Sequence, residues 1–399
     1  MSKAVIFIPG IKGTKLYDSN TVDHEFLWQD FRFQFEDFMR LELTPPFNGQ
    51  YYDESLTTIA RPSNVEPIAY SEFWKNFESE FKFIFPYDWR LPNKENGKRL
   101  KEFMDLIIEK SKASSNNYLP ITHFDFVTHS MGNMPLRYYI LENGMKNINK
   151  IIFITPPFKG SPVAISALAV GQGFFNKEDS RKLARTLPAL FELLPTYQKY
   201  AIDSNDSSTV DLWDINNWQE NLIKQDGNTD KDRTKQKFVD NLGRAKIALH
   251  ELDNWNKNLS EEEKTRIMIL VRTEEETLQD VVIEKNPRDN NPKNYIDFDK
   301  SFSCDEGDGT VPNASSCIYH QEFVTYCFEK RFPQDDYKHA LIMKDSRIQR
   351  VINGFLKSPL NAQLYDHGLI GRNVHLVTSL SAAEIKQDGL THTIAVIKK

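Results

Sequence analysis

The sequence has little cysteine, no long apolar run and no block of basic residues. Its 399 residues include three cysteines, Cys304, Cys317 and Cys327, without a C-x-x-C pair or a nearby pair of histidines. Such a sparse and odd-numbered set argues against a disulfide framework and against a zinc site. No apolar run is long enough to cross a bilayer. The net charge of −6 argues against sequence-nonspecific nucleic-acid binding.

These absences shape what we expect of location and partners. The chain begins with Met1-Ser2-Lys3 and a strand-like run, and nothing there resembles a secretory signal peptide. We expect a soluble, cytoplasmic protein that touches a membrane at most peripherally, with no nucleic-acid partner. We also expect no metal ion and no organic cofactor. The length predicts a large core with a substantial insertion, or two domains.

The chain is rich in apolar residues, at 40% of the total, and in aromatic residues, at 12%. They form strand-like runs that alternate with helix-like segments. Continuous apolar runs read as strands buried on both faces, and helix-like segments with one apolar face lie between them. The strand-like runs are residues 4–8, 124–127, 151–154 and 266–271, and the helix-like segments are 98–112, 136–141 and one starting near Asp345. This alternation predicts a mostly parallel sheet with helices on both faces.

The alternation stops after residue 160. Residues 161–175 carry no charge and form either a buried helix or a mobile apolar lid or acyl-chain wall. We interpret residues 161–265 as an inserted lid and cap. Residues 1–160 and 266–357 would then form the core, and residues 358–399 a C-terminal tail of mixed strand-like character whose role the sequence does not assign.

One strand-to-helix junction carries a serine in a glycine setting. The strand-like run ends in Thr128-His129-Ser130-Met131-Gly132, and a helix-like segment follows. Exposing a serine for attack needs a strained turn with small neighbours, which the pattern G-x-S-x-G describes. The second glycine is present, but Thr128 occupies the place of the first. Taken alone, this stretch is either a nucleophile elbow or an ordinary capped helix start.

A nucleophilic serine needs a base, and the base needs a carboxylate that orients it. In an α/β-hydrolase these groups follow in the order serine, acid, histidine. Asp308 lies in a glycine-flanked loop after the late strands, and His339 lies just before the last helix. Loops at the carboxyl edge of a parallel sheet would carry both residues toward Ser130.

Each of these two partners has rivals. Two acids adjoin Asp308, and other histidines follow it, but none of those histidines lies between a late loop and the final helix. His129 is disfavoured as the base because neighbouring residues on a strand point to opposite faces. The rival acids are Asp305 and Glu306, and the rival histidines are His320, His367, His375 and His392.

A set of motifs in this order resembles the lecithin:cholesterol acyltransferase family, which also includes a lysosomal phospholipase and phospholipid:diacylglycerol acyltransferases. Recognisable motifs span about residues 5–356, with shorter similarities at Pro157–Ser161 and Phe191–Pro195. The main motifs are Pro9-Gly10-Ile11-Lys12-Gly13-Thr14-Lys15-Leu16, Pro86-Tyr87-Asp88-Trp89-Arg90, His129-Ser130-Met131-Gly132-Asn133, Gly307-Asp308-Gly309-Thr310-Val311-Pro312 and His339.

The resemblance implies an α/β-hydrolase fold with an inserted lid and cap. It implies Ser130 as the nucleophile, Asp308 as the acid and His339 as the base. By position in the Pro-Gly-x-x-Gly motif, the backbone N–H of Ile11 would form an oxyanion hole together with that of Met131. From the residues alone, the same turn could be a plain glycine loop.

The resulting hypothesis is a serine hydrolase that cleaves acyl esters of lipids, of phospholipase or lipase type, with O-acyltransferase activity left open. The partner would be a lipid or another acyl ester. A short-chain carboxylesterase or thioesterase is the alternative enzyme, and a catalytically silent binding module is the alternative from another class. Family members that act on lipoproteins or in lysosomes are secreted and carry disulfides. This chain has no suitable cysteine spacing, so those particular substrates are not carried over.

Overall fold

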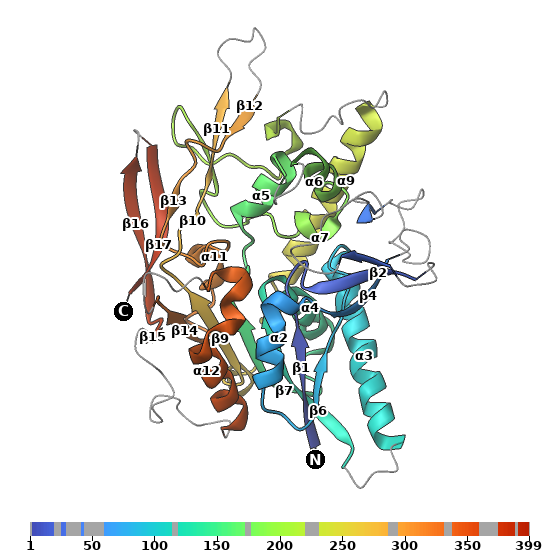
Figure 1. Ribbon diagram of the computed structural model, residues 1–399. Coiled ribbons are helices and arrows are strands. Elements are labelled where there is room, and N and C mark those ends of the chain that lie inside the picture. Colours follow the sequence, from blue (N-terminus) through green and yellow to red (C-terminus); the bar gives the residue numbers. More distant parts are fainter. Residues whose placement is uncertain are drawn as a thin grey trace.

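A seven-stranded sheet runs through the computed structural model of the protein (Figure 1). Its strand order is β15-β14-β9-β7-β6-β1-β5, and every neighbouring pair is parallel except β14 with β15. The structure describes residues 2–19, 25–28, 41–43, 60–113, 119–171, 177–219, 231–285, 294–330, 337–358, 374–387 and 390–398. The strands are β1 (Ser2–Ile8), β5 (Lys82–Ile84), β6 (Ile121–His129), β7 (Ile148–Ile154), β9 (Ile267–Arg272), β14 (Val324–Phe328) and β15 (Val374–Leu376).

The strand-like runs at 4–8, 124–127 and 151–154 fall within β1, β6 and β7, and the run at 266–271 overlaps β9 except at residue 266. The predicted fold class is confirmed. Helices cover both faces of the sheet, with α2 and α12 in front of it in Figure 1. The predicted helix at 98–112 lies inside α3, and the one at 136–141 lies inside α4. The covering helices are α2 (Pro67–Asn76), α3 (Asn93–Ala113), α4 (Asn133–Asn143) and α12 (Ser346–Lys357).

Strand β1 shows why these runs are apolar throughout. Ala4 and Ile6 enter the hydrophobic cluster that α3 and α4 share, whereas Val5 and Phe7 enter the cluster of α2 and α12. Successive side chains of a strand point to opposite faces, so a strand covered on both sides has no solvent-facing position.

Helix α12, predicted to start near Asp345, packs one apolar face on the sheet. Ile348, Val351, Ile352 and Phe355 are buried there, and the side chain of Asp345 accepts a hydrogen bond from the backbone N–H of Arg347 at the start of the helix. Burying four such side chains stabilises the fold by several kcal/mol, at about 1.5–3 kcal/mol each.

The region over the carboxyl edge of the sheet contains the predicted cap residues (Figure 1). Strand β8 (Ala201–Asp203) of this region pairs with β11 (Val281–Lys285), which in turn pairs with β12 (Asn294–Asp297). Strands β11 and β12 follow β9 in the chain, so residues beyond 265 also contribute to this region. The sequence interpretation had assigned it to residues 161–265 alone. The other elements there are α5 (Pro162–Ala169), α6 (Lys177–Ala184), α7 (Pro188–Phe191), η3 (Ile215–Asn217), α9 (Lys231–Leu252) and α10 (Glu261–Lys264).

Helix α5 lies within the uncharged stretch 161–175. It buries most of its side chains, as the buried-helix interpretation predicts. Residues 172–175 of that stretch lie outside the described residues. None of the described helices is long and apolar enough to span a membrane.

Several smaller elements surround this frame. A three-stranded sheet of β2 (Thr14–Asp18), β3 (Phe26–Trp28) and β4 (Ala60–Val65) follows β1. Strands β10 (Thr277–Leu278) and β13 (Ser303–Cys304) pair with each other, and α11 (Asn313–Ser316) follows them. The three cysteines are free thiols.

The C-terminal segment is partly integrated into the core. Strand β15 pairs antiparallel with β14 and forms one edge of the main sheet, while β16 (Ser379–Gln387) and β17 (Leu390–Lys398) form a hairpin. Residues 374–376, 379–387 and 390–398 form strands, and β15 extends the sheet at one edge. Residues 359–373 of the predicted tail lie outside the described residues.

A buried carboxyl group joins the cap region to the core. Glu192 follows α7, and its Oε2 accepts hydrogen bonds from the backbone N–H and the Nδ2 of Asn93, at 3.1 and 2.8 Å. Asn93 begins α3, so this contact ties the segment after α7 to a helix that covers the sheet. Burial raises the pKa of Glu192 to about 7, because the charged form is poorly solvated there.

Replacing Glu192 with Gln should stabilise the protein at high pH. The unfolded carboxyl has a pKa near 4.5 and the folded one about 7, so the wild type loses stability as pH rises between these values. The glutamine does not ionise, and its carbonyl oxygen can still accept from Asn93. Its advantage should be absent at pH 4 and reach about 3 kcal/mol at pH 8, by denaturant unfolding.

The control is Glu102→Gln, which removes an exposed carboxylate from α3. An advantage of Glu192→Gln that is the same at pH 4 and pH 8 would contradict the assignment of a costly buried charge.

Candidate active site

The backbone at Ser130 has the strained geometry of a nucleophile elbow. Strand β6 ends at His129, the one-turn helix η2 (Ser130–Gly132) follows, and α4 begins at Asn133. Ser130 has φ = +52°, a region that residues other than glycine rarely occupy. A Cβ at Gly132 would lie 2.5 Å from the carbonyl oxygens of Ile8 and Pro9, so only glycine fits. Strain of this kind is typical of functional sites.

The threonine in place of the first glycine is accommodated inside the sheet. Thr128 is fully buried in β6, opposite Ile8 of β1 and Phe153 of β7. Its hydroxyl oxygen has no hydrogen-bond partner among the described residues. An unpaired buried hydroxyl costs about 1–3 kcal/mol, which is the physical consequence of this departure from the usual pattern.

The three side chains that the sequence proposed as a triad lie in one hydrogen-bonded row. His339 Nε2 lies 2.7 Å from Ser130 Oγ, and His339 Nδ1 lies 2.6 Å from Asp308 Oδ2. With Nδ1 donating to the carboxylate, Nε2 is left to accept the serine proton. Exposed fractions are 5% for Ser130, 8% for His339 and 1% for Asp308, so water reaches the row poorly.

The carboxylate of Asp308 is held by its own loop. Its Oδ1 accepts the backbone N–H groups of Thr310 and Val311 at 3.0 and 2.7 Å, and its carbonyl oxygen accepts the N–H of His339 at 2.9 Å. These bonds fix Oδ2 toward the imidazole. His339 itself begins the helix η4 (His339–Lys344), between β14 and α12.

The rival residues that the structure describes contact other groups. Glu306 accepts from Asn313, His320 bonds to the carbonyl of Cys317, and His375 lies beside Glu329. Asp305 uses its carbonyl oxygen to accept from Thr273 and Glu274. His367 and the side chain of His392 lie outside the described residues.

A second histidine supports the main chain of His339, which the sequence analysis did not foresee. The hydroxyl of Tyr70 accepts the N–H of Gly10 at 3.1 Å and donates to His129 Nδ1 at 2.7 Å. His129 Nε2 then donates to the carbonyl of His339 at 3.0 Å. Burial lowers the pKa of His129 well below its ordinary value, which keeps the ring neutral as this chain of bonds requires.

The turn after β1 is fixed by aromatic side chains and lies against the serine. Tyr87 donates its hydroxyl to the carbonyl of Pro9, and the indole N–H groups of Trp28 and Trp89 donate to those of Lys12 and Thr14. The three distances are 2.9, 2.7 and 3.0 Å. We call residues 9–14, which contain the proposed oxyanion donor Ile11, the oxyanion loop.

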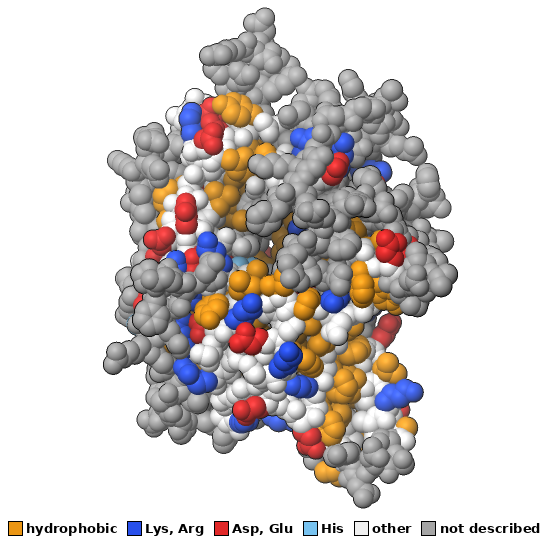
Figure 2. Space-filling view, in the orientation of Figure 1, with side chains coloured by type: hydrophobic (Ala, Val, Ile, Leu, Met, Phe, Trp, Pro, Cys, Tyr) orange, Lys and Arg blue, Asp and Glu red, His pale blue; other side chains and the backbone are white. Residues whose placement is uncertain are grey.

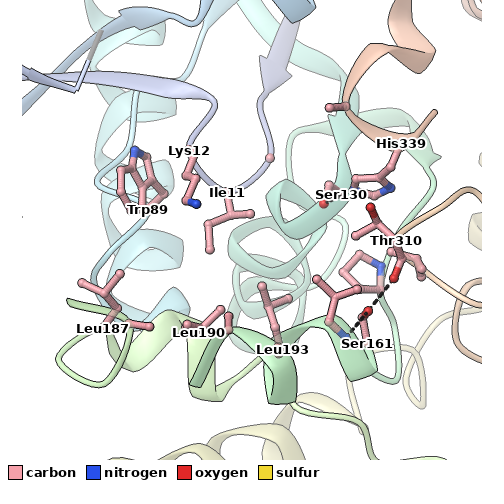
Figure 3. Close-up of a pocket in the computed structure, with 18 of the residues that line it drawn as sticks. Ile11, Lys12, Trp89, Ser130, Ser161, Leu187, Leu190, Leu193, Thr310 and His339 are labelled. Carbon is pink, nitrogen blue, oxygen red and sulfur yellow. Dashed lines mark hydrogen bonds between the residues drawn. The ribbon is translucent and has the colours of Figure 1, made fainter. Parts of the chain in front are cut away.

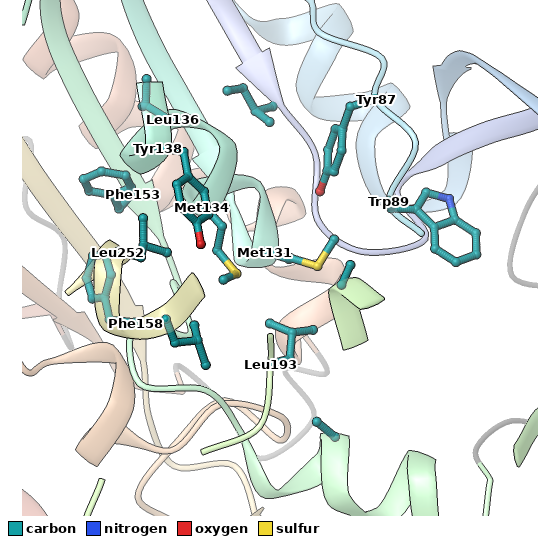
Figure 4. Close-up of a cluster of buried hydrophobic side chains, with 14 of the residues drawn as sticks. Tyr87, Trp89, Met131, Met134, Leu136, Tyr138, Phe153, Phe158, Leu193 and Leu252 are labelled. Carbon is teal, nitrogen blue, oxygen red and sulfur yellow. The ribbon is translucent and has the colours of Figure 1, made fainter. Parts of the chain in front are cut away.

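The proposed oxyanion donors, the backbone N–H groups of Ile11 and Met131, come directly after the two residues at which the loop meets the elbow, Gly10 and Ser130. A Cβ at Gly10 would lie 2.9 Å from Ser130 Cβ, which shows how closely the oxyanion loop approaches the elbow. Within the described chain no hydrogen bond occupies the N–H of Ile11. The N–H of Met131 belongs to the first turn of η2, where a helix leaves its amides without an intrahelical partner. The side chain of Met131 points into the buried cluster shown in Figure 4.

Within the Pro86–Arg90 motif, Asp88 and Arg90 form an ion pair. Arg90 donates from Nε and Nη2 to the two carboxylate oxygens of Asp88, at 2.9 and 2.7 Å, and both side chains are fully buried. Arg90 also donates to the carbonyl of Leu41. This pair is structural, because neither side chain lines the cavity beside Ser130.

A cavity of about 460 Å³ opens beside Ser130 (Figure 3). Ser130, His339 and the oxyanion loop line one side, and the cap region forms an apolar wall on the other, which includes Val163 and Leu193. In Figure 2, hydrophobic side chains lie beside a hollow on the face of the molecule that is turned toward the viewer. The remaining apolar residues of this wall are Pro157, just before the cap region, and Ala164, Ala167, Leu183, Ala184, Leu187 and Leu190 of the cap region.

The cap wall is tied to the loop that carries the acid. Ser161, which caps α5, donates its hydroxyl to the carbonyl of Thr310 and accepts from the N–H of Val163 (Figure 3). Among the described residues, no group of three or more His, Cys, Asp or Glu side chains is arranged to hold a metal ion. The chemistry available to this arrangement is acyl transfer through an activated serine.

Comparison with known families agrees with the motifs. The model of the lecithin:cholesterol acyltransferase family matches residues 80–321, more than half of the chain. The matched range includes Ser130 and Asp308 and ends before His339. No curated protein matches the sequence significantly.

Solved structures share the fold at low sequence identity. A chain of the Tle4–Tli4 complex has a TM-score of 0.60 at 13% identity, covering 88% of this chain and 97% of that chain. Phospholipase PlaB from Legionella pneumophila has a TM-score of 0.22 at 11% identity, covering 50% and 37%. A structure reported with carboxylesterases of the thaumarchaeon Nitrososphaera gargenis has a TM-score of 0.25 at 13% identity, covering 69% and 73%. The last two superpose too poorly to bear on the fold or the function.

Removing the Tyr70 hydroxyl should destabilise the protein. Tyr70→Phe leaves the N–H of Gly10 and Nδ1 of His129 buried without partners, at a cost of about 1–3 kcal/mol in the free energy of unfolding. Tyr139→Phe is the matched control, because its hydroxyl makes a single bond to the carbonyl of Lys146 at a turn. Equal losses in the two variants, measured by urea denaturation, would contradict a special role for Tyr70.

Proposed function

We propose that this protein, which belongs to the lecithin:cholesterol acyltransferase family, cleaves acyl esters of lipids through a covalent acyl-enzyme. Family membership makes it a lipid-acting enzyme of α/β-hydrolase type. The observation that carries the finer proposal is the hydrogen-bonded row Ser130–His339–Asp308 at one side of a cavity whose other side is an apolar cap wall.

In the first half-reaction Ser130 is the nucleophile. His339 Nε2 takes the proton from Ser130 Oγ as this oxygen attacks the ester carbonyl carbon. Asp308 keeps the imidazole oriented and stabilises the imidazolium. The carbonyl oxygen, now negative, accepts hydrogen bonds from the N–H groups of Ile11 and Met131. The tetrahedral intermediate collapses, and the alcohol leaves with the proton from His339.

In the second half-reaction an acceptor takes the acyl group. A water molecule, or the hydroxyl of another lipid, loses its proton to His339 and attacks the acyl-enzyme carbonyl. Collapse then restores Ser130 with the proton returned from His339. Water gives a free fatty acid, whereas a lipid alcohol gives a new ester. The apolar wall excludes water from part of the cavity, which is the condition that transfer requires.

The apolar wall also favours a lipid as the substrate over a short soluble ester. Long acyl chains gain free energy by leaving water, at about 0.8 kcal/mol for each buried methylene group. A cavity of 460 Å³ lies within the usual range for small-molecule sites and can hold part of such a chain.

Ser130→Ala should abolish activity and labelling by an active-site fluorophosphonate, and Asp308→Asn should lower kcat by about 10⁴-fold. Ser166→Ala is the control, because Ser166 lies on α5 away from the cavity lining. Mass spectrometry of a lipid extract incubated with the wild type and with Ser130→Ala would show which esters disappear and where the acyl group ends. Absence of labelling in the wild type would instead support a catalytically silent binding module.

Narrowing the cavity should discriminate between acyl chain lengths. Ala167→Phe adds a ring at the cap wall and should lower kcat/KM for long-chain esters by roughly 10- to 100-fold, with a much smaller effect on short esters. Val170→Phe, at an exposed position just after α5, is the control. A wild type that cleaves only short soluble esters would overturn the lipid assignment in favour of a carboxylesterase or thioesterase.

A further inference from the structure

One lysine lies in the cavity beside the serine. Lys12 follows Ile11 in the oxyanion loop, and Figure 3 shows its side chain between Trp89 and Ile11 at the cavity. It is the only Lys or Arg among the described residues that line the cavity, and no Asp or Glu is among them. The other titratable lining groups are Tyr70, His129 and His339, whose hydrogen bonds are described above.

The ammonium group of Lys12 has no carboxylate partner within the described chain. Its contact there is with the face of Trp28, with Nζ 5.8 Å from the ring centroid. Burial lowers the pKa of Lys12, and no negative charge of the described residues opposes this effect. A cation in apolar surroundings is costly unless an anion joins it. The described lining of the cavity therefore offers a positive charge with which a negatively charged ligand would pair.

The backbone of Lys12 is held in a conformation that suits glycine better. Its φ is +61°, which costs a residue with a side chain about 1–2 kcal/mol. The indole N–H of Trp28 donates to its carbonyl oxygen at 2.7 Å and fixes the residue in place. A side chain at this position thus has a fixed origin, next to the N–H that is proposed to bind the ester oxygen.

We propose that Lys12 forms a phosphate subsite and thereby selects esters of glycerol phosphates over uncharged acylglycerols. This inference rests on the proposed function. When an ester carbonyl lies at Ile11 and Ser130 and its acyl chain lies along the cap wall, the glycerol extends from the ester oxygen on the other side. In a glycerophospholipid the phosphate is attached to that glycerol, within reach of the long side chain of the next residue in the loop.

The charge of Lys12 gives this subsite its selectivity. The ammonium group pairs with a phosphate oxygen by a charge-assisted hydrogen bond, which is roughly twice as strong as a neutral one. A diacylglycerol or a sterol ester offers no negative charge, so binding it leaves the ammonium unpaired. Lys12 acts here on substrate choice, and the proton transfers remain with His339.

The test compares two substrates with identical acyl chains, a phosphatidylglycerol and a diacylglycerol, each presented in the same neutral detergent micelles. The measured quantity is the ratio of their kcat/KM values. Lys12→Met should lower this ratio by roughly 10- to 100-fold, because it removes a hydrogen bond to a charged group. Lys12→Arg should restore most of the ratio. Lys15→Met, which removes a charge from the neighbouring strand β2 outside the cavity lining, should leave it unchanged.

The outcomes separate this inference from the proposed function. An unchanged ratio in Lys12→Met, or a ratio that Lys15→Met lowers equally, would overturn the phosphate subsite while leaving the esterase assignment intact. Fluorophosphonate labelling of Ser130 in Lys12→Met checks that the variant folds. If the wild type cleaves no ester, the proposed function fails, and the subsite fails with it. Inorganic phosphate provides a second arm, since competition with phosphatidylglycerol in the wild type and not in Lys12→Met would support a phosphate site.

Discussion

The contact between the ends of β1 and β6 sets the geometry of the whole site. These strands are parallel neighbours, so the oxyanion loop and the elbow leave the sheet at the same edge. Gly132 lies against the carbonyls of Ile8 and Pro9 so closely that a single methyl group would not fit. This close approach holds Ser130 at a positive φ and brings the loop with Ile11 beside it. The strain is sustained because both strands are covered by helices on both faces.

Hydrogen bonds connect the contact between β1 and β6 to His339, which follows β14. The row from Gly10 through Tyr70 and His129 reaches the carbonyl of His339, whose ring faces Ser130. The same histidine is held from the opposite side by Asp308 through its ring and its backbone. Five segments that are far apart in the sequence thus share one buried network, in which an unpaired polar group would be costly. The cap then covers the network with apolar side chains, where electrostatic interactions are stronger than in water.

Much of the fold and of the candidate site could be predicted from the sequence, because the patterns that specify these parts are local. The apolar runs found β1, β6, β7 and β9, and the helix-like segments found α3, α4 and the start of α12. Chain order and glycine context singled out Asp308 and His339, which do lie with Ser130. The place of His129 was missed, since the alternation of side chains along a strand ceases to apply where β6 ends and the elbow begins. The edge strand β15 was missed because a three-residue strand carries too little pattern.

By itself the sequence determined the order of elements, the two-sided burial of the strands, and a set of residues capable of serine chemistry. Periodicity and spacing encode these features, because they follow from how a helix or strand presents successive side chains. Only the tertiary structure decided that His129 supports the main chain of His339 and that Tyr70 links the oxyanion loop to His129. It also decided that Lys12 lines an apolar cavity without a carboxylate partner among the described residues. Those relations join residues that are distant along the chain, and they arise from packing that no local pattern records.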